Sequence, residues 1–219
     1  MAISSYSELK TAISNWAARN DTAFTDRVDE FIDLCESRIH YGAEDPYKSE
    51  PLRVMGMEQA NETITISAQT TALPTGFLEA RSLYLDTSPK VDLDYMPPDR
   101  FWQSLAAKAG SAEQPSIYTI QGTNLVVAPS PDASYTGKIS YYKKLDPLSA
   151  SATTNWLITN YPNIYLYGCL MEAQIFLKDF EEVDRMFANF RSSMGGVVKQ
   201  DDQAKHSGSG LSVKVDQAP

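Results

Sequence analysis

The chain has 219 residues, 42% hydrophobic and 21% charged, so it can bury a core as one large domain or two small ones. Its net charge of -9 argues against a nucleic-acid-binding protein, because such proteins need a basic face to release counterions from phosphates. Two cysteines, Cys35 and Cys169, are too few for a disulfide scaffold, and we expect both to be buried reduced thiols.

Residues 1–48 predict two helices. Ser5 and Glu8 form a capping box, and apolar residues then recur at helical spacing. After a short polar link, the second helix is expected to begin near Thr25 and to end before Gly42. Both helices are amphipathic, which predicts that they pack against other elements through one face.

Residues 49–148 predict an antiparallel β-domain, because the hydrophobic period changes to two. Strands are expected at 63–66, 82–85, 91–95, 116–120, 125–128 and 139–142. A turn containing Gly122 predicts a hairpin, and short loops between successive strands favour antiparallel pairing. A short helix is expected between residues 98 and 109.

Residues 149–195 predict two further helices. The first begins at Pro162 and is apolar on almost every face, so it must lie inside a bundle or a subunit contact. Asp179 and Glu182 form a second capping box, and the pair Gly195-Gly196 is expected to end the last helix.

Residues 196–219 differ in composition from the rest of the chain. They contain no aromatic residue and include the run Ser-Gly-Ser-Gly, so we expect a flexible C-terminal arm. Leu211–Val215 alternates like a strand and can add to a sheet edge of another subunit or partner. The predicted fold is therefore α+β: a four-helix bundle built from both chain ends, an inserted antiparallel β-domain and an extended C-terminal tail.

Aromatic residues gather around the start of the apolar helix: Trp156, Tyr161, Tyr165 and Tyr167. A hydrophobic core accounts for them. A subunit contact accounts for them equally, because Tyr and Trp are enriched where an apolar body meets a polar edge. Both interpretations stay open from the sequence.

Evidence for catalysis is weak. His40 is expected at a helix end and His206 in the flexible arm, and neither setting is the rigid one that a general base needs. Asp92 and Asp94 fall on one side of a predicted strand and could serve glycoside hydrolysis or hold calcium, but a solvated strand face explains them better. Metal-ligand spacing, a phosphate loop and an apolar run of roughly 18 residues are all missing. We expect no enzyme activity, no cofactor and no membrane partner.

Three segments resemble the head-to-tail adaptor proteins of tailed bacteriophages: Leu73–Leu78, Gly122–Pro131 and Tyr141–Asp179, the last with TNWLITNYP and YLYG. The resemblance extends over residues 5–196, although Gly76 stands where family members tend to have an acidic residue. It implies a structural virion protein at the head–tail junction, assembled in the host cytoplasm. Such proteins form a ring, usually of twelve copies, between the portal and the tail nozzle.

The resemblance also assigns roles to parts of the chain. It implies that the C-terminal arm reaches the portal, with candidate contacts Val197, Lys199, Lys205, Leu211, Val213 and Val215. The rest of the ring would contact nozzle and tail-fibre proteins. Viral DNA would pass through without specific binding, and an acidic wall suits such a passage because like charges repel. Asp29 and Asp33 are the candidate channel-facing residues.

Two rival functions remain. The first is a tail-associated carbohydrate-binding or fibre-attachment module that uses Trp102, Tyr95 and Asp94; saturable sugar binding would support it. The second is a hydrolase that uses Asp92 and Asp94. A double Asp→Asn variant that still assembles virions would exclude the hydrolase.

Overall fold

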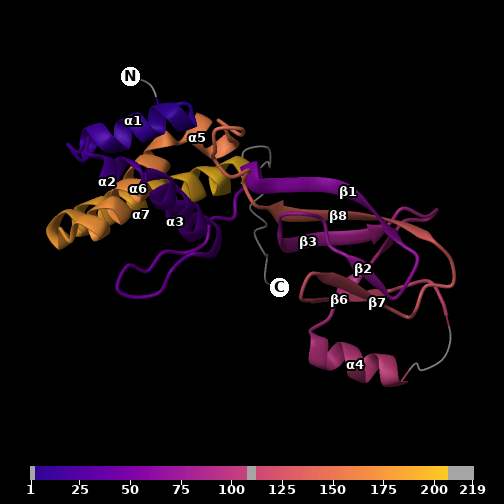
Figure 1. Cartoon of the computed structure of the whole chain (residues 1–219). Helices are drawn as coiled ribbons and strands as arrows, with labels where there is room; N and C mark the ends of the chain where they lie inside the picture. Colours follow the sequence, from indigo (N-terminus) through magenta and orange to yellow (C-terminus); the bar gives the residue numbers. More distant parts are fainter. Residues whose placement is uncertain (1–2, 108–111, 207–219) are drawn as a thin grey trace, which may run out of the picture. The chain divides into compact units, whose positions relative to one another are not determined.

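A computed structural model of the chain describes residues 3–107 and 112–206. The chain divides into two units, drawn in Figure 1. The helical unit is formed by the two ends of the chain, up to Gly56 and from Asp146 onward, and the β-unit by Met57–Leu145. The fold class is α+β, as the sequence predicts.

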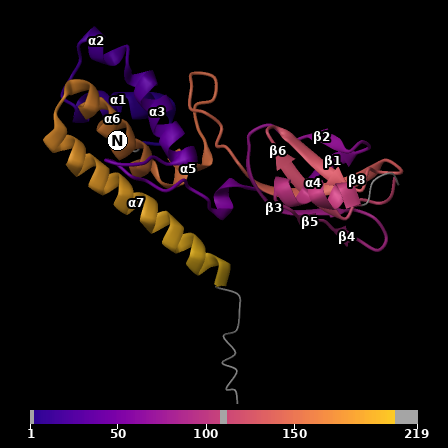
Figure 2. The same ribbon diagram turned by 90° about the horizontal axis from the view of Figure 1, so that it is seen from below.

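The helical unit is organised around one central helix. Its elements are α1 (Tyr6–Trp16), α2 (Thr22–Thr25), α3 (Val28–Tyr41), α5 (Trp156–Asn160), α6 (Pro162–Leu177) and α7 (Phe180–His206). Helix α6 packs against α1, α3, α5 and α7. Figure 2 shows α7 as a long helix beside this group.

The apolar sequence of α6 is explained by its surroundings in its own chain. Every residue from Ile164 to Ala173 except Tyr167 is buried. A Cβ at Gly168 would lie 2.4 Å from Cys35 Sγ and 3.1 Å from the Phe190 ring, so a glycine lets α3 and α7 approach the helix closely. The apolar helix therefore needs no second subunit to cover it.

Helix α7 continues past the expected stop at Gly195-Gly196, so that prediction was wrong; the helix ends at His206. A helical glycine costs about 1 kcal/mol relative to alanine. Burial on both sides of the pair offsets this cost, because Met194 is 7% exposed and Val197 is 4% exposed. They belong to the buried stripe Val183, Phe190, Met194 and Val197.

In both predicted capping boxes, the side chain of the capping residue accepts the backbone N–H of the residue three positions later. The Glu8 N–H donates to Ser5 Oγ at 3.5 Å, and the Glu182 N–H donates to Asp179 Oδ1 at 3.4 Å. The Glu8 carboxylate accepts a hydrogen bond from the backbone N–H of Ser4 at 2.8 Å, and not from that of Ser5. These caps fix the starts of α1 and α7.

The second predicted helix begins at Val28, slightly later than expected, and a separate short helix, α2, precedes it. Asp21 caps α2 by accepting the N–H of Phe24 at 3.1 Å, and α3 begins only at Val28. Burial of Phe24, which is fully inaccessible, holds this extra turn in place.

The β-unit contains two four-stranded sheets. Its strands are β1 (Glu58–Ile66), β2 (Thr70–Ala72), β3 (Phe77–Leu85), β4 (Val91–Asp92), β5 (Asp94–Tyr95), β6 (Ile117–Gln121), β7 (Asn124–Ala128) and β8 (Tyr135–Lys143). One sheet has the order β1-β8-β3-β4 and the other β2-β7-β6-β5. Their shared core is Ile64, Ile66, Leu83, Leu85, Leu93, Tyr118, Leu125, Val127, Ile139 and Tyr141.

Strand pairing follows the lengths of the connections. The hairpin β6–β7 closes with Gln121 opposite Asn124, and Gly122 has φ of +60°, which confirms the predicted turn. One pair, β5–β6, is parallel, so the expectation of purely antiparallel pairing was wrong here. The connection between these two strands contains α4 (Pro98–Ala107) and is long enough for a crossover.

The predicted strand 91–95 is two strands in different sheets. Val91–Asp92 pairs with β3, whereas Asp94–Tyr95 pairs with β6. Leu93, between them, is 5% exposed and belongs to the core. The single strand on which Asp92 and Asp94 were expected does not form.

Candidate partner-binding surfaces

Tyr165 lies in a buried polar cluster of the helical unit. Its hydroxyl donates to Glu36 Oε1 at 3.0 Å and accepts from Asn155 Nδ2 at 2.7 Å. Glu36 also accepts the N–H of Leu148 at 2.9 Å, and Asn155 caps α5 by accepting the N–H of Ile158 at 3.0 Å. The cluster thus ties α3 and α6 to the segment that enters α5, and Tyr165 is a core residue.

Burial raises the pKa values of two groups in this cluster. Glu36 is 6% exposed, and its burial raises the pKa of the carboxyl above the usual range, although the hydrogen bonds from Leu148 and Tyr165 oppose the rise. Burial and the nearby Glu36 carboxyl raise the pKa of the Tyr165 hydroxyl. Both groups therefore act as structural hydrogen-bonding groups.

A second pair, with a buried acid and a partly buried arginine, joins α3 to α6. Arg38 donates to Glu172 Oε1 from Nη2 at 2.9 Å and from Nε at 3.1 Å, and from Nη1 to the Tyr47 carbonyl at 3.1 Å. Glu172 is 8% exposed and is the one acid in the apolar helix. No local pattern indicates its partner, which is 134 positions away in the sequence.

The other three aromatic candidates are half-buried. Trp156 covers Gly56, where a Cβ would lie 2.1 Å from the indole, and its ring centroid is 5.6 Å from that of Tyr161. The Tyr161 hydroxyl donates to Gln200 of α7 at 2.8 Å. Tyr167 meets the ring of Trp16 edge-on at 6.2 Å, and Trp16 is 58% exposed. These side chains combine packing inside the chain with surface that remains uncovered.

The two candidate channel acids are both exposed on α3 but differ in their contacts. Asp29 accepts from Tyr6 and forms an ion pair with Lys10 at 2.8 Å. Burial raises the pKa of Asp29, but the hydrogen bonds from Lys10 and Tyr6 outweigh burial and hold the pKa below its usual value. Asp33 forms no ion pair with any residue that the structure describes, so its charge is not neutralised by a partner.

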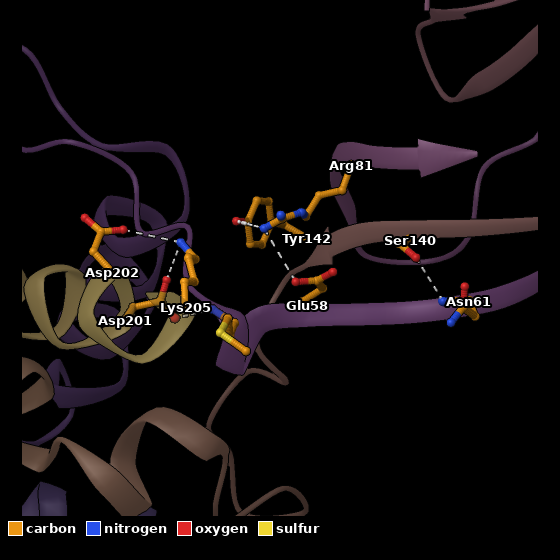
Figure 3. Close-up of polar contacts among 9 residues, drawn as sticks. Glu58, Asn61, Arg81, Ser140, Tyr142, Asp201, Asp202 and Lys205 are labelled. Atoms are coloured by element: carbon orange, nitrogen blue, oxygen red, sulfur yellow. Dashed lines mark hydrogen bonds and ion pairs between the residues drawn. The ribbon is translucent and has the colours of Figure 1, made fainter. Parts of the chain in front are cut away.

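The candidate portal contacts differ in their surroundings. Val197 is buried in the helical unit, and Lys199 is exposed on α7. Lys205 is paired with Asp201 at 2.6 Å and Asp202 at 3.4 Å, as Figure 3 shows. Asp201 also accepts the N–H of Met55 at 2.8 Å, at the start of the 3-10 turn η1 (Met55–Met57). Leu211, Val213 and Val215 lie outside the described residues.

A groove, here called the α7 groove, runs between residues 45–52 and α7. Its volume is about 1130 Å³. Accessible apolar side chains on its floor include Phe187, Met194 and Val198, and Val198 is 40% exposed. Charged side chains of both signs border it: Asp45, Lys48, Glu50, Arg191, Lys199 and Asp202. An apolar floor with a mixed polar border is typical of a binding site for a peptide segment.

The β-unit presents a polar sheet face (Figure 3). Arg81 of β3 donates to the Tyr142 hydroxyl of β8 at 2.8 Å, lies over its ring at 5.4 Å and is 3.5 Å from Glu58 of β1. Farther along, the Asn61 N–H donates to Ser140 Oγ at 3.1 Å. Tyr142 follows Tyr141, which points into the core, so this face is the outer one.

Comparison with known protein families identifies the class of protein. Residues 4–213 match the family described as SU10 adaptor protein. The chain belongs to this adaptor family. The resemblance drawn from the sequence is thereby confirmed, and the protein is a structural adaptor component of a phage virion. A search of curated proteins gave no significant match.

The adaptor family is not a class of enzymes. Asp92 and Asp94 are exposed on strands of different sheets, and the described residues contain no group of three or more His, Cys, Asp or Glu that could hold a metal ion. His40 is buried at the end of α3, and the side chain of His206 lies outside the description. None of the described helices is long and apolar enough to cross a membrane.

Some features of this adaptor had no recognisable signal in the sequence. The α7 groove joins positions more than 130 residues apart, and neither side predicts the other. Glu36 did carry a signal, because it lies between Ile32 and Ile39 on the apolar side of its helix. An acid at such a position predicts a buried partner.

Proposed function

We propose that the protein forms a closed ring of twelve copies that joins the portal to the tail nozzle and tail fibres and lines the passage for DNA. The observation that carries this proposal is the family match over residues 4–213. Helices α1, α3, α6 and α7 would act as the four-helix bundle of each subunit, with the β-domain of residues 49–148 inserted between them. The ring would stand at the head–tail junction after assembly in the host cytoplasm.

Exposed apolar side chains support the assembly of several copies. Trp16, Leu34, Tyr41 and Phe180 of the helical unit are each more than half exposed, at 58%, 52%, 57% and 61%. Rings close through two different surfaces of the same subunit, so apolar area must remain uncovered in a single chain. We propose that Trp156, Tyr161 and Tyr167 contribute to these contacts with their uncovered edges.

The C-terminal arm is proposed to contact the portal. With α7 continuing to His206, the arm begins after that residue and includes Leu211, Val213 and Val215. Lys199 and Lys205 would flank it on α7. Val197 supports the arm indirectly, because its side chain packs inside the helical unit.

The acidic face of α3 is proposed to face the DNA passage. Asp33 is the stronger candidate, because the negative charge of Asp29 is balanced by its ion pair with Lys10. Like charge along the wall would let the duplex slide without specific binding.

The test is reconstitution with the cognate portal. Purified chain and portal are mixed and imaged by electron microscopy, with free chain and free portal as controls. A twelvefold ring added to one end of the portal is expected. A portal that stays bare at saturating chain concentration would refute the proposal.

Exposed aromatic side chains favour a second candidate role for the β-unit. Tyr95 is 56% exposed and Trp102 is 46% exposed, and Asp94 adjoins the first. Such a set can stack on and hydrogen-bond to a sugar, as a carbohydrate-binding or fibre-attachment module would. A glycan array with the Trp102→Ala variant as control tests this role, and binding equal to that of the variant would exclude it.

A further inference from the structure

The α7 groove has the dimensions of a peptide-binding site, and the chain itself carries a segment that fits it. Helix α7 ends at His206, three residues after Gln203, the last residue that lines the groove. Thirteen residues follow (219 minus 206), beginning with Ser-Gly-Ser-Gly. Gly208 and Gly210, the second and fourth residues after the helix, permit the sharp reversal needed to return along it.

We propose that in the free subunit Leu211–Asp216 lies in the α7 groove of its own chain, extended and antiparallel to α7. An extended segment from Leu211 to Val215 spans about 13 Å at 3.3 Å per residue. Nine residues of helix span about the same length at 1.5 Å each. With Leu211 beside Gln203, Val215 therefore lies beside Met194.

Side-chain alternation matches the groove floor. Leu211, Val213 and Val215 project to one side of an extended chain, which matches the apolar floor of the groove. Val213 falls near Val198, which is 40% exposed. A Cβ at Gly195 would meet no atom within 4 Å, so the helix surface is open where Val215 arrives.

Charge supports the same direction of the chain. The next residue, Asp216, falls about two helix residues beyond Met194 and so lies close to Arg191. Arg191 lines the groove and forms no ion pair with any residue that the structure describes. Lys214 projects to the side opposite Val213 and Val215, where solvent surrounds it. A segment running parallel to α7 would place none of these groups together.

The inference goes beyond the proposed function and does not depend on it, because it concerns the chain before any partner binds. A segment held in the groove cannot contact a portal at the same time. Binding to a partner would then require its release, so the groove would compete with the partner for the arm.

Disulfide trapping in the full chain tests the position. The variant Val198→Cys, Val213→Cys is compared with Val198→Cys, Ser212→Cys under mild oxidant; Cys35 and Cys169 stay buried in both. Ser212 projects away from the groove, so trapping at residue 213 is expected to be at least about tenfold faster. Equal rates would overturn the proposal. A disulfide between two chains would also overturn it, because the occupant would then be a second copy.

Hydrogen exchange gives an independent measurement. Val213→Asp is expected to speed amide exchange of residues 45–52 about tenfold, whereas Ser212→Asp, with the same added charge, leaves it unchanged. The proposal fails if the two variants exchange alike. If trapping succeeds while no ring forms on the portal, the proposed function fails and the groove inference stands.

Discussion

At the scale of single residues, buried polar groups decide how the helices of the helical unit meet. Tyr165, Glu36 and Asn155 satisfy one another, and Arg38 satisfies Glu172. Leaving a buried polar group without a hydrogen-bond partner destabilises the folded state by more than a satisfied hydrogen bond stabilises it. These clusters therefore fix one arrangement of α3 against α6.

Two substitutions of Tyr165 separate the contributions of ring packing and hydrogen bonding to stability. Tyr165→Ala is expected to lower the free energy of unfolding by about 3–5 kcal/mol, because a fully buried aromatic ring is lost. Tyr165→Phe keeps the ring and is expected to cost about 1–3 kcal/mol, because Glu36 loses a donor. Urea unfolding measures both; equal losses would show that the hydroxyl carries the whole effect.

Glu36 predicts a dependence of stability on pH. Because burial raises its pKa in the folded state, the folded chain binds the proton more tightly than the unfolded chain. Its contribution to stability therefore falls as pH rises from its unfolded pKa, about 4.3, to the raised folded value, and is constant above it. Thermal melts of the native chain and Glu36→Gln across this window are expected to diverge. Parallel curves would count against a raised pKa.

At the scale of elements, most helix starts and strands follow from local pattern, whereas several ends and breaks do not. The capping residues Ser5 and Asp179 indicate in the sequence where α1 and α7 begin. The continuation of α7 through Gly195-Gly196 is accompanied by burial of Val197, which is 4% exposed. Leu93 is likewise buried in the core of the β-unit, and the strands before and after it belong to different sheets. Local propensity cannot report such tertiary burial.

Two glycine substitutions in helices are expected to have opposite effects. Gly168→Ala places a Cβ 2.4 Å from Cys35 Sγ and is expected to destabilise the chain by about 1–3 kcal/mol. Gly196→Ala meets no atom within 4 Å and is expected to stabilise it by about 0.5–1 kcal/mol, as in any exposed helix interior. Chemical denaturation compares them. Loss of stability in Gly196→Ala would show that α7 does not continue there.

At the scale of the whole molecule, the family and the two-part order of helices and strands are readable from the sequence, but the surfaces are not. The α7 groove and the polar face around Arg81 each combine residues from distant segments. Their chemistry depends on which side chains the fold brings together. The sequence therefore predicts what kind of protein this is more completely than where it binds.

Removing the arm tests its role without disturbing the helices. A chain that ends at His206 keeps all of α7 and is expected to unfold at the same temperature as the full chain or a few degrees lower, while binding its portal weakly. Sedimentation with portal, beside melting curves, measures both. Full portal binding by the shortened chain would remove the arm from the portal contact.

A charge reversal tests the DNA passage. Asp33→Lys is expected to slow DNA release from assembled virions, because a cation on the wall would hold the phosphates. Glu181→Lys, an exposed acid at the start of α7, makes the same change elsewhere and serves as the control. Identical release from both variants would place α3 away from the passage.

The burial of residues 164–173 of α6, all but Tyr167, within one chain has a consequence for how such a protein is made. A polypeptide whose interior is closed by its own segments reaches its native state without meeting another copy, so its melting temperature is expected to be the same at micromolar and at millimolar concentration. Synthesis and assembly then become separate events. Folding of each subunit would then not depend on its incorporation into an assembly.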